Sequence, residues 1–176
     1  LHHHDETAGL ALHVDAAKDA ISAAEARQAM EDLYAGIAWR PNLVPMLRRY
    51  FEVLEQRDSA SLVHCVAGKD RTGFAVAMLH HALGVHPDDI MADYLMTNAA
   101  GRIEARIAAG ASQIRQRYGA IDDATVRTLM GVEESYLANA FRAIRERHGD
   151  LDAYLAEVLG VDAPRIAALR QRYLAA

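Results

Sequence analysis

The stretch at residues 61–73 reads Ser-Leu-Val-His-Cys-Val-Ala-Gly-Lys-Asp-Arg-Thr-Gly. Its first six residues, 61–66, are partly β-branched and bounded by turn residues, which is the pattern of a short strand. A loop follows at residues 67–70, and residues 72–83 are apolar nearly all round, which predicts a buried helix. A strand that passes through a glycine-containing loop into a helix turns its amide groups and the positive helix end toward one point. The stretch therefore predicts an anion-binding loop.

The rest of the chain predicts helices almost throughout. Residues 15–39 predict one or two helices, and residues 42–56 a further helix with its apolar side chains on one stripe. The helical segments downstream are residues 87–97, 102–118, 122–130, 133–148, 151–159 and 162–174. One strand cannot make a sheet, so its partners are expected in weak strand signals such as residues 10–14, or before Leu1. We expect an α/β fold with an all-helical C-terminal half, in one domain over residues 1–176 that lacks its N-terminal strands.

The composition excludes several classes of protein. The chain has 176 residues, of which 52% are hydrophobic and 24% charged, as in one globular domain rather than a disordered chain. The formal net charge of −5 disfavours general binding to nucleic acid, because a phosphate backbone needs a basic face. No apolar run reaches the ~18 residues that cross a membrane. The sequence leaves the compartment and the oligomeric state open.

Cys65 is the only cysteine, so it can form no internal disulfide. Arg71 follows it after five residues, at the start of the predicted helix. A loop of this length can curl so that its amides and the Arg71 guanidinium surround the sulfur, which lowers the pKa of a thiol and makes it nucleophilic. Arg71 can hold two phosphate oxygens at once, and Thr72 offers a hydroxyl to the sulfur. A nucleotide-binding P-loop is excluded, because its first glycine is missing and Asp70 stands where Ser or Thr is needed.

The pattern Cys-x5-Arg-Thr resembles the signature of protein tyrosine phosphatases and dual-specificity phosphatases. The fuller string His-Cys-x-x-Gly-Lys-Asp-Arg-Thr-Gly, residues 64–73, is similar to that of a bacterial subfamily that acts on phosphotyrosine and, in several members, on phosphoserine, phosphothreonine and phosphoinositides. The resemblance extends over most of residues 30–176. It implies a tyrosine-phosphatase-like sheet flanked by helices, a phosphorylated protein or phosphoinositide as substrate, and no cofactor. Family members usually begin with an Asn-Phe-Arg-Asp-like segment and several strands, which this sequence does not display.

The expected reaction is the hydrolysis of a phosphate monoester through a cysteinyl-phosphate intermediate. Cys65 attacks phosphorus, and Arg71 and the loop amides hold the phosphate oxygens. The residues expected to bind phosphate are Val66, Ala67, Gly68, Lys69, Asp70, Arg71 and Thr72. No metal is expected, because Arg71 and the amides supply the positive field. The alternatives are an inactive phosphate-binding module, a sulfurtransferase that uses the same cysteine loop, and a redox protein, which the lack of a second cysteine disfavours.

Three roles stay open. His64 is expected to support the loop by hydrogen bonding. Lys69 either gives the pocket rim a charge for phosphoinositide headgroups, as the resemblance suggests, or only lowers the pKa of Cys65, or is a solvated loop charge. The proton for the leaving group is expected from Asp70, which lies in the loop, or from Asp5, which resembles the aspartate on the separate acid loop of related phosphatases. We favour Asp70, whose alternative role is a structural carboxylate that holds the loop.

Overall fold

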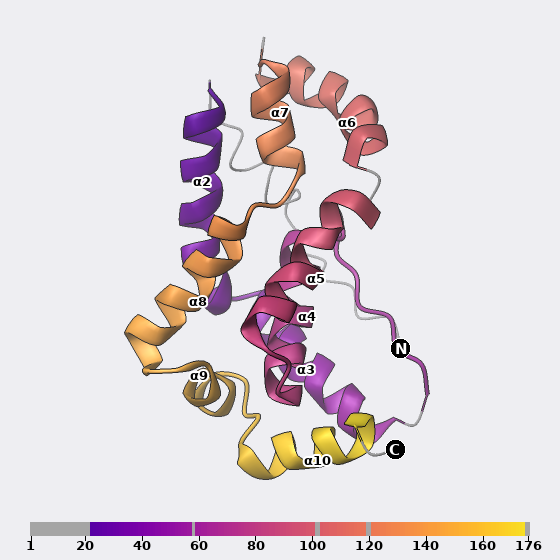
Figure 1. The fold of residues 1–176 in the computed structure, drawn as a ribbon, viewed down its shortest axis with the longest axis vertical. Helices are drawn as coiled ribbons and strands as arrows, with labels where there is room; N and C mark the ends of the chain where they lie inside the picture. Colours follow the sequence, from indigo (N-terminus) through magenta and orange to yellow (C-terminus); the bar gives the residue numbers. More distant parts are fainter. Residues whose placement is uncertain (1–21, 58, 101–102, 119–120, 175–176) are drawn as a thin grey trace.

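The computed structural model describes residues 22–57, 59–100, 103–118 and 121–174. All the regular elements in these residues are helical (Figure 1). In chain order they are α2 (Ala23–Ala35), the 3₁₀ turn η1 (Ile37–Trp39), α3 (Leu43–Gln56), α4 (Asp70–Leu83), α5 (Pro87–Ala100), α6 (Ile103–Tyr118), α7 (Asp123–Met130), α8 (Glu134–His148), α9 (Leu151–Glu157) and α10 (Ala163–Leu174). Within these residues no helix combines the length and the apolar character needed to cross a membrane.

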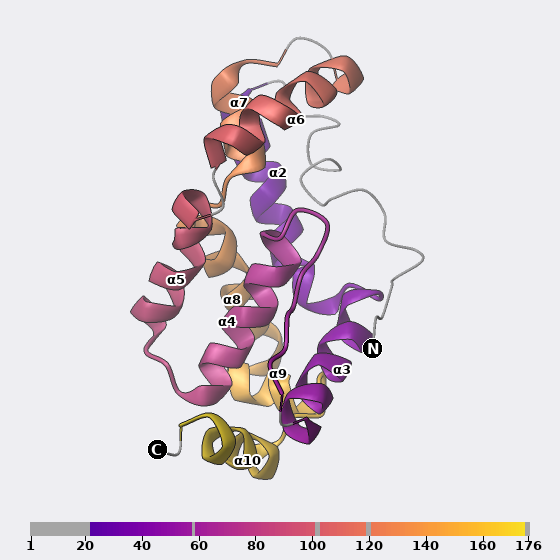
Figure 2. The same ribbon diagram turned by 90° about the vertical axis from the view of Figure 1, so that its right-hand side faces the viewer.

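The predicted sheet is wrong for the described residues, and with it the α/β fold class. Residues 61–66 form no strand, although they carry the chain as an unpaired trace to the loop at the start of α4 (Figure 2). A strand is stabilised by pairing with another strand, and every other regular element in the described part of the chain is a helix. Leu62 and Val66 are exposed, whereas Val63 packs on the core. The weak strand signal at residues 10–14 lies outside the described residues.

The helices expected from residue 42 onward are confirmed, with ends that differ by at most three residues. They follow the local signals that predict them. Asp122 and Asp150 each precede a helix and accept a hydrogen bond from a backbone amide of its first turn, as helix N-caps do. Gly84 ends α4 with φ of 85°, in the left-handed region where glycine is favoured. Residues 15–39 give α2 and η1, as far as the structure describes them.

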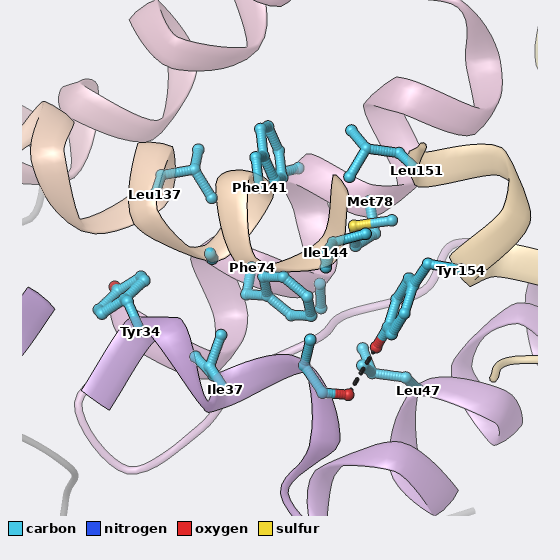
Figure 3. Packing of buried hydrophobic residues seen from close by; sticks show 14 of the residues in the cluster. Tyr34, Ile37, Leu47, Phe74, Met78, Leu137, Phe141, Ile144, Leu151 and Tyr154 are labelled. Carbon is cyan, nitrogen blue, oxygen red and sulfur yellow. Dashed lines mark hydrogen bonds between the residues drawn. The ribbon is translucent and has the colours of Figure 1, made fainter. Parts of the chain in front are cut away.

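The helix that follows the loop, α4, runs through the core. Figure 3 shows Phe74 and Met78 of α4 among side chains from η1, α3, α8 and α9. Phe74, Ala77 and Met78 are fully buried. Because a buried apolar side chain of this size stabilises the fold by about 1.5–3 kcal/mol, the packing holds α4, and with it the end of the loop, in one position.

A second, smaller cluster joins α6 to α7 at one end of the molecule (Figure 1). Its buried members are Ala111, Ile121, Val126 and Met130, with Ile103 and Ile107 packed against them. Leu129 of α7 belongs to the main core, and Gly131 follows the end of α7. Both residues contribute a backbone carbonyl to the site described next.

Candidate active site

The loop from Val66 to Lys69 leads directly into α4. Gly68 has φ of 66°, a left-handed conformation that a residue with a Cβ rarely adopts, so glycine favours the turn here. The amides in the first turn of an α-helix have no acceptor within the helix. Those of α4 therefore face the loop with the positive end of the helix dipole behind them.

The surroundings of Cys65 favour its thiolate. Burial disfavours the charged form and is the largest single influence on the half-buried sulfur. The hydroxyl and amide of Thr72, the amide of Gly68 and the charge of Arg71 act in the opposite direction and outweigh burial. The pKa of Cys65 consequently lies below its usual value. Of the groups expected to surround the sulfur, the amides of Gly68 and Thr72 and the charge of Arg71 favour the thiolate in this structure.

The neighbours of Cys65 contribute unequally. The buried Thr72 hydroxyl makes no hydrogen bond of normal length and angle to any described residue, but it lies near enough to the sulfur to favour the thiolate. His64 is exposed, and its Nδ1 lies 3.4 Å from the carbonyl oxygen of Cys65. Val66 and Gly68 are exposed at the loop tip, and Arg71 is partly buried. The side of the loop that carries Val66 and Gly68 is therefore open to solvent.

Lys69 turns away from that open side. It is completely buried, and its Nζ donates to the carbonyl oxygens of Leu129 and Gly131 at 2.6 and 2.9 Å. The same ammonium lies 3.2 Å from Oδ1 of Asp70. A buried charge needs partners of this kind, because its removal from water costs several kcal/mol. The structure therefore brings Lys69 to the end of α7 and not to the rim, where one sequence interpretation had it.

Asp70 is also buried, and its carboxylate accepts a hydrogen bond from a buried tyrosine. The Tyr34 hydroxyl donates to Oδ1 of Asp70 at 3.0 Å, and the Tyr94 hydroxyl donates to the Tyr34 oxygen at 2.8 Å. Burial raises the pKa of Tyr34 and of Tyr94, so both hydroxyls keep their protons at ordinary pH. These contacts resemble those of a structural carboxylate. Asp5, the other candidate acid, lies outside the described residues.

Sequence analysis did not single out Tyr34 and Tyr94. Both occupy apolar helical positions, where an aromatic ring is expected to be core. The signal that could have drawn attention to them is chemical: a buried tyrosine hydroxyl needs a hydrogen-bond partner, and the loop supplies a carboxylate. Gly73 completes the arrangement, since a Cβ there would lie 2.9 Å from two ring atoms of Tyr94.

The histidines of α4 do not form a metal site with other described residues. His80 and His81 lie near different aspartates, Asp93 and Asp152, at 3.8 and 2.9 Å. More broadly, among the residues with described side chains, no three His, Cys, Asp or Glu lie close enough to hold a metal ion.

Curated proteins with related sequences are named as phosphatases. A protein of Cupriavidus necator that carries the name of a tyrosine-protein phosphatase is 42% identical over 114 residues, 65% of this chain and 39% of that protein. The triple specificity protein phosphatase PtpB of Mycobacterium tuberculosis is 40% identical over 104 residues, 53% of this chain and 37% of its own. A tyrosine-protein phosphatase of Nostoc commune is 28% identical over 144 residues, 78% of this chain and 47% of its own.

This chain spans less than half the length of each of these relatives. The family assignment rests on a wider match, because the profile of the tyrosine phosphatase family covers residues 2–175. That range contains Cys65, Arg71 and every element described above. By its sequence, the chain belongs to the tyrosine phosphatase family.

Proposed function

We propose that this chain carries the catalytic loop of a phosphatase that hydrolyses phosphate monoesters through a cysteinyl-phosphate intermediate. The observation that supports this most strongly is the lowered pKa of Cys65, whose sulfur faces the amides of Gly68 and Thr72 beside the charge of Arg71. Because the chain spans less than half of its relatives' length, the activity of the whole protein is part of the proposal.

The reaction has two steps. In the first, the Cys65 thiolate forms a bond to phosphorus while the bond to the leaving oxygen breaks, and an acid protonates that oxygen. In the second, water attacks the phosphorus of cysteinyl-phosphate, its proton passes to the conjugate base, and the thiolate leaves. The loop amides and the planar guanidinium of Arg71 stabilise the charge on the three remaining phosphate oxygens in both steps.

The proton donor of the first step has two candidates, Asp70 and Asp5. Oδ1 of Asp70 accepts from Tyr34 and faces Lys69 in the interior, which favours Asp5 as the acid and Asp70 as a carboxylate that holds the loop. Phenyl phosphate needs a proton on its leaving group, whereas 2,4-dinitrophenyl phosphate does not. Loss of the acid therefore lowers kcat mainly on phenyl phosphate.

The two candidates are separated by measuring both substrates with Asp5→Asn and Asp70→Asn. We expect Asp5→Asn to lose far more activity on phenyl phosphate, and Asp70→Asn to lose a similar factor on both. The reverse pattern makes Asp70 the acid.

For the substrate we propose phosphotyrosine first, with phosphoserine, phosphothreonine and phosphoinositides as further candidates. One relative is named a triple specificity phosphatase, which supports testing more than one class. The Lys69 ammonium donates to the carbonyl oxygens of Leu129 and Gly131. We therefore expect a second phosphate of a phosphoinositide to bind a cation other than Lys69. Lys69→Ala should then reduce kcat/KM by similar factors on a phosphotyrosine peptide and on a phosphoinositide. A loss of kcat/KM on the phosphoinositide alone would show that Lys69 contacts this substrate at the rim of the pocket.

The decisive experiment replaces the nucleophile. Cys65→Ser should lower kcat by at least ~10³-fold, as for other nucleophile removals, while inorganic phosphate still binds through the amides and Arg71. Wild-type activity in Cys65→Ser would exclude the mechanism. Phosphate binding by a wild-type protein that turns over none of the substrates would instead identify a binding module, and turnover of thiosulfate a sulfurtransferase.

A further inference from the structure

Two charged residues stand at the junction of the loop and α4, and both are buried. Lys69 is 0% exposed and Asp70 2%, although burying such groups costs several kcal/mol each before their partners are counted. Lys69 precedes α4 and Asp70 is its first residue. Gly68 and Thr72, whose amides face the Cys65 sulfur, lie within two residues of Asp70. The buried pair is therefore placed where it can fix the loop.

The hydrogen bonds of Asp70 continue inward through two tyrosines. Tyr34 of α2 donates its only hydroxyl proton to Asp70, and Tyr94 of α5 donates its own to Tyr34. Each bond supports the next, because a hydroxyl whose oxygen accepts a hydrogen bond becomes a better hydrogen-bond donor. The ionised carboxylate of Asp70 can only accept, so the hydrogen bonds run from Tyr94 to Tyr34 to Asp70. It connects three helices, α5, α2 and α4, at one point beneath the loop.

Two observations make this connection specific. Tyr94 approaches α4 at Gly73, where any Cβ would lie 2.9 Å from its ring. The Tyr34 ring packs against Tyr136 and Tyr94, with centroids 5.6 and 6.3 Å away. Phenylalanine at either position would retain the ring and lose only the hydroxyl. The function of the hydroxyl can therefore be tested apart from the packing.

We propose that Tyr34 and Tyr94 are positioning residues of the phosphate loop, which hold Asp70 and thereby aim the amides of Gly68 and Thr72 and the Arg71 side chain at the Cys65 sulfur. This rests on the proposed phosphatase function and adds to it two positioning groups that act through Asp70. Because the Tyr34 hydroxyl donates directly to the carboxylate, its loss should affect the loop more than the loss of the Tyr94 hydroxyl.

The test measures alkylation of Cys65 by iodoacetamide against pH, with and without inorganic phosphate, in the intact protein. It reports the thiol pKa and the affinity for phosphate without any turnover. We expect Tyr34→Phe to raise the thiol pKa and to weaken phosphate binding and kcat/KM roughly 10- to 100-fold, as when a hydrogen bond to a charged group is lost. Tyr94→Phe, which loses a bond between neutral groups, should show the same changes at roughly 2- to 10-fold.

Tyr154→Phe is the matched control. Tyr154 is equally buried, and its hydroxyl donates to the backbone carbonyl of Ala38 at 2.8 Å in the core, which is not a group of the loop (Figure 3). Its loss should lower stability by a similar amount and leave the thiol pKa and the phosphate affinity unchanged.

The outcomes separate the two proposals. If Tyr34→Phe and Tyr94→Phe match Tyr154→Phe in thiol pKa and phosphate affinity, the positioning role is wrong. If Tyr34→Phe does not fold, Tyr94→Phe decides by the same two readouts. If the wild-type thiol titrates like that of an unfolded chain and phosphate gives no protection, the proposed function fails instead.

Discussion

The two flanks of the loop are held in opposite ways: the incoming flank is residues 61–66, and the outgoing flank is Lys69 with α4. The segment that leads in has Leu62 and Val66 exposed by 86% and 69%, and its backbone joins no sheet within the described residues. The flank that leads out buries two charged side chains and ties them to α2 and α7. Among the described residues, the buried polar contacts therefore lie on the α4 side of the loop, and we expect that side to set the geometry around Cys65.

The largest effect is expected from removing the buried cation. Lys69→Met leaves two carbonyl groups and Asp70 without their charged partner, so the free energy of unfolding should fall by about 3–5 kcal/mol. Denaturant unfolding followed by circular dichroism measures this. Arg142→Met, which changes an exposed cation of α8, is the control and should cost no more than about 1 kcal/mol. Equal losses in the two variants would mean that the outgoing flank is not the better anchored one.

A smaller effect is expected where α5 meets α4. Gly73→Ala forces the Tyr94 ring to move, because the new Cβ would lie 2.9 Å from it. Overpacking of this kind costs about 1–3 kcal/mol, and kcat/KM should fall as the hydrogen bond of Tyr94 is disturbed. The double variant with Tyr94→Leu should recover part of the lost stability, since the flat ring is gone. Additive losses in a double-mutant cycle would show that the contact does not matter.

The pH dependence of stability tests the contacts of the Cys65 sulfur itself. The folded-state pKa of Cys65 is depressed, so the thiolate stabilises the folded protein above the unfolded thiol's pKa of about 8.5. This contribution is lost as the pH falls through the lower folded-state pKa. The stability difference between wild type and Cys65→Ser should therefore grow in favour of wild type from acid pH to above pH ~8.5. A difference that does not change with pH would contradict the lowered pKa.

The smallest effect is expected on the incoming flank. Leu62→Ser removes an exposed side chain and should change the free energy of unfolding by no more than about 0.5 kcal/mol. Its neighbour Val63 packs on the core, so Val63→Ser should cost about 1–2 kcal/mol. Thermal unfolding of the two variants under identical conditions measures the difference. A loss of more than 1 kcal/mol in Leu62→Ser would show that this flank is anchored through Leu62 as well.

Features that depend on neighbouring residues could be predicted from the sequence. Helical periodicity located α3 through α10 to within three residues, because a helix closes its hydrogen bonds four residues apart. The five-residue spacing between Cys65 and Arg71, with Gly68 between them, predicted the loop and the low thiol pKa, because these groups are also close in sequence. All of these groups lie within one short turn of chain.

Features that depend on distant partners could not be predicted. Whether residues 61–66 form a strand depends on a second strand, and the described residues contain only helices. The direction of Lys69 and Asp70 was set by groups 60 and 36 residues away, the carbonyl of Leu129 and the hydroxyl of Tyr34. From sequence alone, a charged side chain in a glycine-containing loop is expected to be solvated by water. Only tertiary packing can replace that water with a carbonyl group or a tyrosine hydroxyl. The groups that surround Cys65 could thus be predicted from the sequence alone. Which charges of the loop face the interior depends on the packed fold, because a buried charge is stable only beside partners that the fold brings to it.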